Sequence, residues 1–303
     1  MSESIDHFIT VPDGLRLHVR IHGDGNGGVP IVCLPGLTRN VLDFEDLARI
    51  LAAPPYGRRV IAISSRGRGL SDRDPQPERY TIPVEAGDVI SVLDQLGIET
   101  ADFIGTSRGG LILHVLAMTH LGQIERLVLN DIGPVLEVEG LKQIQGYLGS
   151  RRAPNTFSEA AEILQATHGA EFPALGAEDW AGMARALYRD VEGKLVADFD
   201  PAIAEQFRTA DLAQGLPDLW PQFALLVDKR VMVVRGGFSR LLSRKTVEEM
   251  ERRHPGLVAV ESRGQGHAPM LHLNGLAEEI GAFLARGGAD PERTEAIESA
   301  VAA

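Results

Sequence analysis

Short apolar runs alternate with helical patterns along most of this chain, and this alternation limits the possible folds more than any other feature. The apolar runs are IVCLPG, RRVIAISS, ADFIGTS, ERLVLND, VMVVRGG and LVAVESRG. Stretches with a helical period, such as VLDFEDLARIL and VEAGDVISVLDQLG, lie between them. Strands that alternate with helices indicate βαβ units. The sequence therefore predicts a parallel, doubly wound α/β sheet with helices on both faces.

Two segments depart from this rhythm. Residues 5–23 alternate around the turn Pro12-Asp13-Gly14, which predicts a hairpin at one edge of the sheet. Residues 134–216 carry helical patterns, among them FSEAAEILQATHG, and no run that predicts a strand. An all-helical insertion is expected to cover the carboxyl ends of the strands, where ligands bind in open α/β folds. We predict a core of residues 1–133 and 217–286, a helical cap of residues 134–216 and a polar C-terminal tail of residues 287–303.

Composition excludes several classes of function. A formal net charge of −12 argues against binding of nucleic acid, which would need a basic surface. The single cysteine, Cys33, rules out an intramolecular disulfide. The N-terminus lacks the pattern of a signal peptide, and no apolar run is long enough to span a bilayer. We expect a cytoplasmic protein that acts on a small-molecule substrate without membrane or nucleic-acid partners, and the sequence is compatible with a homodimer.

The strongest chemical motif is Gly105-Thr106-Ser107-Arg108-Gly109, between the predicted strand ADFI and the predicted helix GLILHVLAM. A serine on a tight strand-to-helix turn holds its hydroxyl clear of the sheet, and the flanking glycines allow strand and helix to approach closely. The alternative is a glycine-rich turn with a bystander serine. The position between strand and helix favours Ser107 as a nucleophile.

Two backbone N–H groups are candidates for an oxyanion hole, which stabilises the negative oxygen of a tetrahedral intermediate. Arg108 stands at the predicted N-terminus of the helix after Ser107, where its N–H has no partner within the helix. The second donor should come from the loop Leu34-Pro35-Gly36-Leu37-Thr38. Pro35 has no N–H to donate, so Leu37 is the candidate for the second donor. The alternative is an ordinary glycine turn, and the presence of the Ser107 motif favours the donor.

His267 is the candidate general base among the nine histidines. It lies in the segment GQGHAP, after the last predicted strand and before the last predicted helix. A histidine at that position is on a loop at the carboxyl edge of the sheet and follows the serine in chain order. His272 is the competitor, but we expect it on or near the following helix.

These segments together resemble the α/β-hydrolase family, in particular its bacterial branch with a serine nucleophile and a helical cap. The resemblance covers the loop LPGLTRN, the segment SRGRGLSD, the turn GTSRGG, the segment NDIGP at the cap junction and the loop GHAP. It implies a mostly parallel eight-stranded sheet flanked by helices, with the cap inserted after strand 6. It also implies a cofactor-free hydrolase of esters, lactones or related acyl compounds.

One position departs from the family pattern. Members of this branch usually carry the third catalytic residue, an acid, in a segment that resembles SDLLS, and here the segment reads SRLLS with Arg240 at the aspartate position. A cation there disfavours a protonated imidazole. Asp131, at the end of the strand RLVLN, is a replacement that preserves the chain order. The other readings are a slow dyad of Ser107 and His267, and a binding protein that has lost hydrolysis.

The predicted function is therefore a serine hydrolase that cleaves a carboxylic ester or lactone of a small, largely apolar substrate. Trp180, Tyr188, Phe199 and Trp220 are candidate lining residues of an acyl pocket, and the alternative is that some of them form the core of the cap. A carbon–carbon bond hydrolase of a diketone is the alternative reaction. No cluster of histidine, cysteine and carboxylate has metal-ligand spacing, so we expect neither a metal nor a cofactor.

Overall fold

The structure is a computed structural model that describes residues 4–148, 153–212 and 217–285. The predicted tail of residues 287–303 lies outside the described residues. An eight-stranded sheet forms the centre, with the strand order β1-β2-β4-β3-β5-β6-β9-β10. Its strands are β1 (Ile5–Thr10), β2 (Arg16–His22), β3 (Ile31–Leu34), β4 (Val60–Ile63), β5 (Ala101–Thr106), β6 (Ile124–Asn130), β9 (Arg230–Gly236) and β10 (Val258–Ser262).

The sheet has one antiparallel edge and a parallel remainder. β1 pairs with β2, and β2 pairs with β4, in antiparallel register. The pairs from β4 through β3, β5, β6 and β9 to β10 are all parallel. The predictions of a mostly parallel eight-stranded sheet and of a hairpin at its edge are confirmed.

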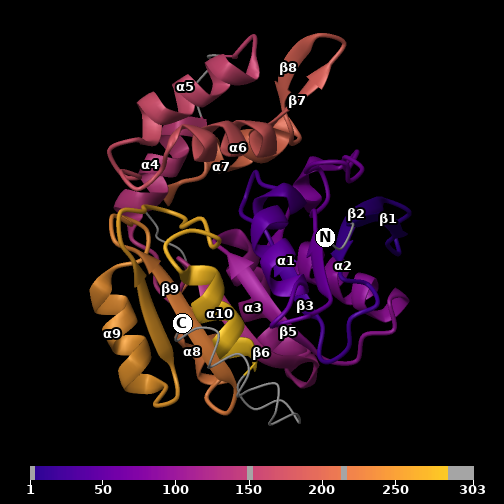
Figure 1. The fold of residues 1–303 in the computed structure, drawn as a ribbon, viewed down its shortest axis with the longest axis vertical. Helices are drawn as coiled ribbons and strands as arrows, with labels where there is room; N and C mark the ends of the chain where they lie inside the picture. Colours follow the sequence, from indigo (N-terminus) through magenta and orange to yellow (C-terminus); the bar gives the residue numbers. More distant parts are fainter. Residues whose placement is uncertain (1–3, 149–152, 213–216, 286–303) are drawn as a thin grey trace.

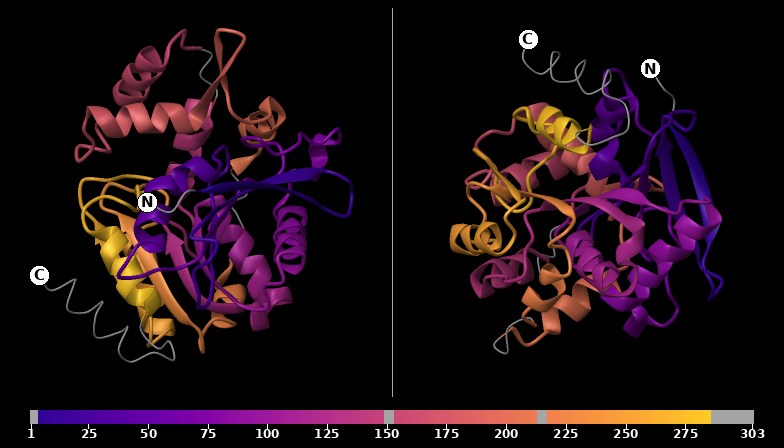
Figure 2. Two further views of the ribbon diagram at one scale, coloured as in Figure 1. Left: turned by 45° about the vertical axis from the view of Figure 1, so that its right-hand side comes forward. Right: turned by 90° about the horizontal axis from the view of Figure 1, so that it is seen from below.

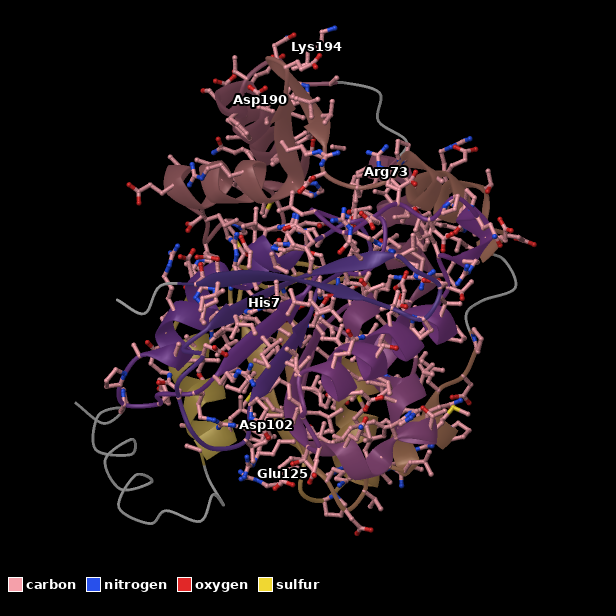
Figure 3. All side chains as sticks on the ribbon, turned by 90° about the vertical axis from the view of Figure 1, so that its right-hand side faces the viewer. His7, Arg73, Asp102, Glu125, Asp190 and Lys194 are labelled. Atoms are coloured by element: carbon pink, nitrogen blue, oxygen red, sulfur yellow. The ribbon has the colours of Figure 1, made fainter. Side chains whose placement is uncertain are left out.

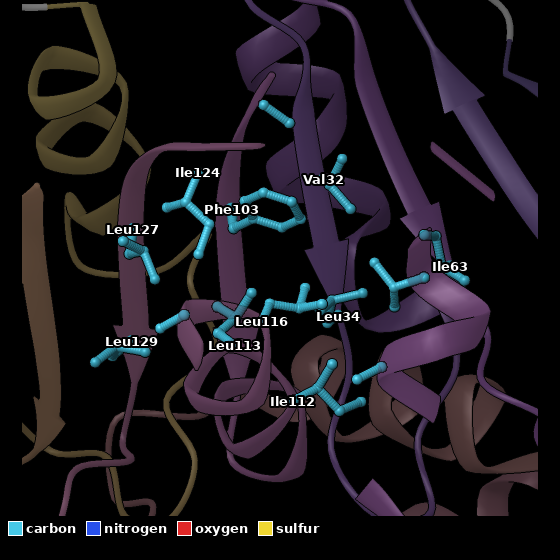
Figure 4. Close-up of a cluster of buried hydrophobic side chains, with 14 of the residues drawn as sticks. Val32, Leu34, Ile63, Phe103, Ile112, Leu113, Leu116, Ile124, Leu127 and Leu129 are labelled. Atoms are coloured by element: carbon cyan, nitrogen blue, oxygen red, sulfur yellow. The ribbon is translucent and has the colours of Figure 1, made fainter. Parts of the chain in front are cut away.

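Successive residues of the buried strands point alternately to the two faces of the sheet. Val32 and Leu34 join Phe103, Leu127 and Leu129 in a cluster on one face (Figure 4). That face is covered by α2 (Ile82–Gln95), α3 (Arg108–Thr119), α8 (Trp220–Ala224) and α9 (Arg244–Arg253). The residues between them point into a second cluster under α1 (Glu45–Ala52) and α10 (Leu276–Ala285). Because both faces are buried, the strands read as continuous apolar runs rather than as alternating ones.

A separate group of elements stands over one end of the sheet, at the top of Figure 1 and of the left view in Figure 2. It contains α4 (Val138–Leu148), α5 (Phe157–His168), α6 (Ala177–Leu187) and α7 (Pro201–Thr209). It follows β6 in the chain and lies at the carboxyl ends of the parallel strands. A small apolar cluster that includes Leu164, Phe172 and Trp180 holds α5 and α6 together. We call these elements the cap.

The cap also contains a two-stranded antiparallel sheet, so the expectation of an all-helical insertion was wrong. β7 (Tyr188–Val191) pairs with β8 (Lys194–Ala197). Glu192 and Gly193 join them, and both have positive φ angles, 54° and 79°, as a tight two-residue hairpin turn requires. In Figure 3, Asp190 and Lys194 mark this hairpin at the far end of the molecule from Asp102 and Glu125. The helical pattern AEDWAGMARALYRD hid the change, because α6 ends at Leu187 and the strand follows without a break.

Hydrogen bonds fasten the cap to the core. Asn40 in the core donates from its amide to the backbone oxygen of Ala186 at 2.9 Å and to the Asp198 carboxylate at 3.0 Å. The Tyr80 hydroxyl donates to Asp200 at 2.7 Å. The contacts join segments more than a hundred residues apart and fix the cap above the strand ends. Among the described residues, no helix is both long and apolar enough to cross a membrane.

Candidate active site

Ser107 occupies the sharp turn between β5 and α3, with φ 51° and ψ −113°. A positive φ is costly for a residue with a side chain and occurs where the surroundings enforce it. Two glycines make the turn sterically possible. A Cβ on Gly109 would lie 2.1 Å from the carbonyl oxygen of Leu34, and one on Gly105 would lie 2.7 Å from the N atom of Gly110. The glycines thus let strand and helix meet, as the motif predicts.

A continuous chain of hydrogen bonds runs from this serine through a histidine to an aspartate. The Nε2 atom of His267 lies 2.9 Å from Oγ of Ser107. Its Nδ1 atom lies 2.7 Å from Oδ2 of Asp131. The three residues follow β5, β6 and β10, and the parallel strands bring their ends to the same edge of the sheet. The structure therefore brings together all three residues proposed from the sequence as nucleophile, base and acid.

Asp131 is fully buried and held by further donors. It follows β6 with a φ of 52°, a left-handed conformation that aspartate tolerates better than most residues. The backbone N–H of Gly236 donates to Oδ1 at 2.7 Å, and the hydroxyl of Ser239 donates to Oδ2 at 2.5 Å. These donors replace the hydrogen bonds to water that a buried carboxylate loses.

Two amide side chains that sequence reasoning missed hold the loop of His267. Asn130 donates to the backbone oxygen of Pro269 at 2.9 Å and to the hydroxyl of Thr106 at 3.1 Å. Gln265 donates to the hydroxyl of Ser262 at 2.8 Å and accepts from the N–H of Met270 at 2.8 Å. Both lie beside residues already chosen, in the segments NDIGP and GQGHAP, and that proximity was the available signal.

Arg240, which stands at the usual aspartate position, takes no part in this chain of hydrogen bonds. Its guanidinium pairs with Glu139 at 3.0 Å and with Glu171 at 3.3 Å, and its side chain is 55% exposed. Both partners belong to the stretch that follows β6. Arg240 thus links the loop after β9 to the cap through ion pairs with these two glutamates.

The candidate oxyanion donors lie at the same place. Arg108 is the first residue of α3, and Leu37 lies in the turn after β3; both line the same cavity as Ser107. Neither backbone N–H donates to an acceptor within the described part of the chain. A Cβ on Gly36 would lie 3.8 Å from Cβ of Ser107, so the loop after β3 passes close to the serine. These two N–H groups are free to bind an oxygen on an attacked carbon.

A buried ionic network lies directly beneath the turn. Arg68 and Arg108 both donate to Glu85, at 2.7 Å from Arg68 and at 2.7 and 2.9 Å from Arg108. Burial by itself would raise the pKa of Glu85, but the attraction of the two guanidinium groups lowers it. Arg66 is paired in the same way with Asp88 and Asp74. Arg66 and Arg68 therefore brace the loops under the site, and neither reaches into the cavity.

A cavity of about 1190 Å³ lies between cap and core, with Ser107 and His267 in its wall. Most of its lining is apolar, with leucines, isoleucines and Met183 from the cap and Leu241 from the core. Two arginines, Arg39 and Arg108, line it in the described part of the chain, and each is paired with a carboxylate.

Of the four aromatic residues proposed for the pocket, Tyr188 and Phe199 line this cavity, and Trp180 and Trp220 do not. Trp180 is 2% exposed and packs inside the cap against Phe172, because its position on α6 faces the cap's own cluster. Trp220 begins α8 on the core and stacks under the guanidinium of Arg253 at 4.0 Å. The assignments of Trp180 and Trp220 were wrong. Aromatic type and rough position in the chain do not tell which way a side chain faces.

Within the described residues, no group of three or more histidine, cysteine, aspartate or glutamate side chains could hold a metal ion. Cys33 is buried in β3. The groups that the site itself offers for chemistry are the Ser107 hydroxyl, the His267 imidazole, the Asp131 carboxylate and the backbone N–H groups of Leu37 and Arg108.

Comparison with known proteins gives consistent results. The sequence profile of the family described as "alpha/beta hydrolase fold" matches residues 29–270. The chain is 34% identical over 266 residues to a 3-hydroxybutyrate-oligomer hydrolase of Cupriavidus necator, covering 85% of this chain and 89% of that protein. It is 28% identical over 279 residues to a 2-(acetamidomethylene)succinate hydrolase of Mesorhizobium japonicum, covering 91% of this chain and 93% of that protein.

Solved structures agree with the fold. An α/β hydrolase from Novosphingobium aromaticivorans superposes with a TM-score of 0.82 at 36% identity and covers 100% of this chain and 99% of its own. A protein from Rickettsia typhi superposes with a TM-score of 0.80 at 26% identity, over 94% of this chain and 98% of its own. The chain belongs to the α/β-hydrolase family, and it is a hydrolase.

Proposed function

We propose that this protein is a serine hydrolase of carboxylic esters, and that short oligomers of hydroxy acids are its substrates. Ser107 attacks the ester carbon as His267 takes its proton, and the N–H groups of Leu37 and Arg108 bind the oxyanion. His267 then gives the proton to the leaving alcohol. Water, activated in turn by His267, releases the acyl group from Ser107. Asp131 orients the imidazole and stabilises its protonated form.

The single observation that carries this proposal is the chain of hydrogen bonds from Ser107 through His267 to Asp131. Its two distances, 2.9 and 2.7 Å, are those of formed hydrogen bonds. This chain of hydrogen bonds also argues against an impaired protein, because Asp131 is in a position to take the role that Arg240 cannot fill.

Three features support an oligomeric, uncharged ester as the substrate. The cavity of about 1190 Å³ exceeds the 300–1,000 Å³ that is usual for small-ligand sites, so it has room for more than one hydroxy-acid unit. Its apolar lining suits short aliphatic chains. A relative with 34% identity, aligned over most of both chains, is a 3-hydroxybutyrate-oligomer hydrolase.

The charge distribution separates this substrate class from a compact dicarboxylate, such as the one named for the relative from Mesorhizobium japonicum. Binding two carboxylates in an apolar cavity would require cations that are free to pair with them. Arg39 is paired with Asp43, and Arg108 with Glu85. The site is therefore better suited to a neutral ester bond, with any terminal carboxylate near the solvent.

The experiment has two parts. Purified protein is treated with a fluorophosphonate and the modified peptide is mapped by mass spectrometry; we expect modification at Ser107 and none in Ser107→Ala. Turnover is then compared among dimers and trimers of 3-hydroxybutyrate, p-nitrophenyl butyrate, a simple lactone and a vinylogous diketone. Oligomer cleavage with the highest kcat/KM is expected. Preferred cleavage of the diketone would instead establish the carbon–carbon hydrolase, and an unlabelled but folded protein would contradict the nucleophile.

A further inference from the structure

Ser239 lies in the loop between β9 and α9, and its hydroxyl contacts the same carboxylate oxygen as the imidazole. It donates to Oδ2 of Asp131 at 2.5 Å, and Nδ1 of His267 lies 2.7 Å from that oxygen. Oδ1 is occupied separately by the N–H of Gly236 at 2.7 Å. Hydrogen bonds therefore hold both oxygens of this buried carboxylate, and Ser239 and His267 contact the same one, Oδ2.

The Ser239 hydroxyl is itself held in a fixed direction. Its oxygen accepts the backbone N–H groups of Leu241 and Leu242, each at 3.2 Å. With two donors on the oxygen, the hydroxyl proton is directed to Asp131. Arg235 holds the loop from behind by donating to the backbone oxygens of Ser239 at 3.1 Å and Leu242 at 2.8 Å. Ser239 is 8% exposed and does not line the cavity.

The charged groups around this loop are engaged elsewhere. Arg235 pairs with Glu261 at 3.1 Å, and Arg240 pairs with Glu139 and Glu171 on the cap side. Among the described residues, no arginine or lysine contacts the Asp131 carboxylate, whose side-chain partners are His267 and Ser239. The group that donates to Oδ2 beside His267 is thus the neutral hydroxyl of Ser239.

We propose that Ser239 is a positioning residue for the reaction, which fixes the rotation of the Asp131 carboxylate and limits the negative charge that Oδ2 presents to His267. The inference rests on the proposed hydrolase function. A hydroxyl that donates to a carboxylate at this distance is among the stronger hydrogen bonds in proteins. Its loss frees the carboxylate to rotate, and it leaves more charge on Oδ2 to stabilise the protonated imidazole.

The test compares Ser239→Ala with wild type in the full-length protein, with p-nitrophenyl butyrate as the probe. We expect kcat to fall roughly tenfold to a hundredfold, the range expected from loss of one charge-assisted hydrogen bond. KM should change less than about twofold, because Ser239 does not reach the cavity. The acid limb of the kcat/KM profile, which reports protonation of the free enzyme's base, should move to higher pH.

Two further variants separate positioning from general loss of structure. Ser239→Thr keeps the hydroxyl, and its kcat should remain within about threefold of wild type. If Ser239→Ala does not fold, Ser239→Cys replaces it: the thiol is a weaker donor, so kcat should also fall and the acid limb should also move to higher pH. Ser243→Ala is the matched control in the same loop. Ser243 accepts the N–H of Thr246 at 3.2 Å as the N-cap of α9. Its loss should lower the thermal midpoint without moving the acid limb.

The outcomes for Ser239 are distinct from those for the proposed function. An unchanged kcat in Ser239→Ala would overturn the inference, as would a lower kcat with the acid limb unmoved or moved to lower pH. Either result leaves Ser107 labelling in the wild type intact. A wild type that neither reacts with fluorophosphonate nor hydrolyses the probe would instead contradict the proposed function and, with it, the role of Ser239.

Discussion

At the scale of single residues, the site depends on where a carboxylate stands rather than on which segment supplies it. The family pattern would place an acid at position 240, and this chain has an arginine there. Asp131, at the end of a neighbouring strand, lies 2.7 Å from Nδ1 of His267. Arg240 faces the cap and pairs with glutamates. A change that appears damaging in the sequence therefore leaves the imidazole with a carboxylate partner.

Asp131→Asn tests whether Asp131 supplies the carboxylate that the family pattern places at position 240. The amide has nearly the shape of the carboxylate but no charge, so it cannot stabilise a protonated imidazole and can favour the wrong tautomer. We expect kcat for an ester to fall about 10³- to 10⁴-fold, as with loss of the carboxylate in other serine hydrolases. Steady-state kinetics on p-nitrophenyl butyrate provides the measurement.

Arg240→Ala is the control for this prediction, because its side chain points away from the imidazole. Its kcat should stay within about threefold of wild type, because Arg240 pairs with Glu139 and Glu171 and with none of the three residues of the hydrogen-bonded chain. Loss of these exposed ion pairs should also cost little stability. The assignment of Asp131 fails if Asp131→Asn retains activity within a few-fold, or if the arginine variant loses as much as the aspartate variant.

At the scale of elements, the turn between β5 and α3 depends on close backbone approach. Ser107 has a positive φ, and the helix that follows it begins against the end of β3. The space is so limited that the glycine after Arg108 cannot carry a side chain without movement of backbone atoms. The local motif therefore determines the geometry of the nucleophile together with the packing of α3 on the sheet.

Gly109→Ala should destabilise the fold and lower activity together. Its Cβ would lie 2.1 Å from the carbonyl oxygen of Leu34, so strand or helix must shift. We expect a loss of about 2 kcal/mol in the free energy of unfolding, typical of overpacking, measured by urea denaturation. Gly122→Ala is the matched control, because a Cβ there meets nothing within 4 Å. A Gly109→Ala variant as stable and active as Gly122→Ala would contradict the close approach.

At the scale of the whole molecule, charge is arranged in ionic clusters that join distant segments. Glu45 at the start of α1 accepts from Arg20 on β2 at 3.2 Å and from Arg49 at 2.7 Å, and lies 3.4 Å from Nε2 of His22. The hydrogen bond with His22 is the largest cause that lowers the pKa of Glu45 from 4.5 to about 2, and the arginine Arg20 adds to it. This cluster ties the edge hairpin to the first helix.

Glu45→Gln should therefore reduce stability in a pH-dependent way. A carboxylate whose pKa is lower in the folded than in the unfolded state stabilises the fold above the unfolded pKa, here 4.5, and this contribution disappears as the pH falls toward about 2. The difference in unfolding free energy between wild type and the variant should be largest near neutral pH and shrink below about pH 4.5. Urea denaturation across this range checks it, with exposed Glu78→Gln as control. A constant difference at every pH would contradict the role of the charge.

Local sequence was sufficient where a feature depends on neighbouring residues. The pattern of apolar residues determined the parallel sheet and its edge hairpin. Strands buried on both faces give continuous apolar runs, and strands buried on one face give an alternating pattern. The segment GTSRGG determined the sharp turn of Ser107, since only glycine fits beside it. The order of strand, loop and helix placed His267 at the same edge. These predictions needed no information about distant segments.

Tertiary structure alone decided the features that depend on facing side chains. Only the meeting of β6, β9 and β10 brings Asp131, Ser239 and His267 into one network. Asp131 lies more than a hundred positions from the other two, and α9 and β10 lie between Ser239 and His267. The same reason explains why Trp180 and Trp220 were misassigned and why the hairpin of β7 and β8 was missed. Direction into a cavity is a property of packing, and packing is settled by the whole chain.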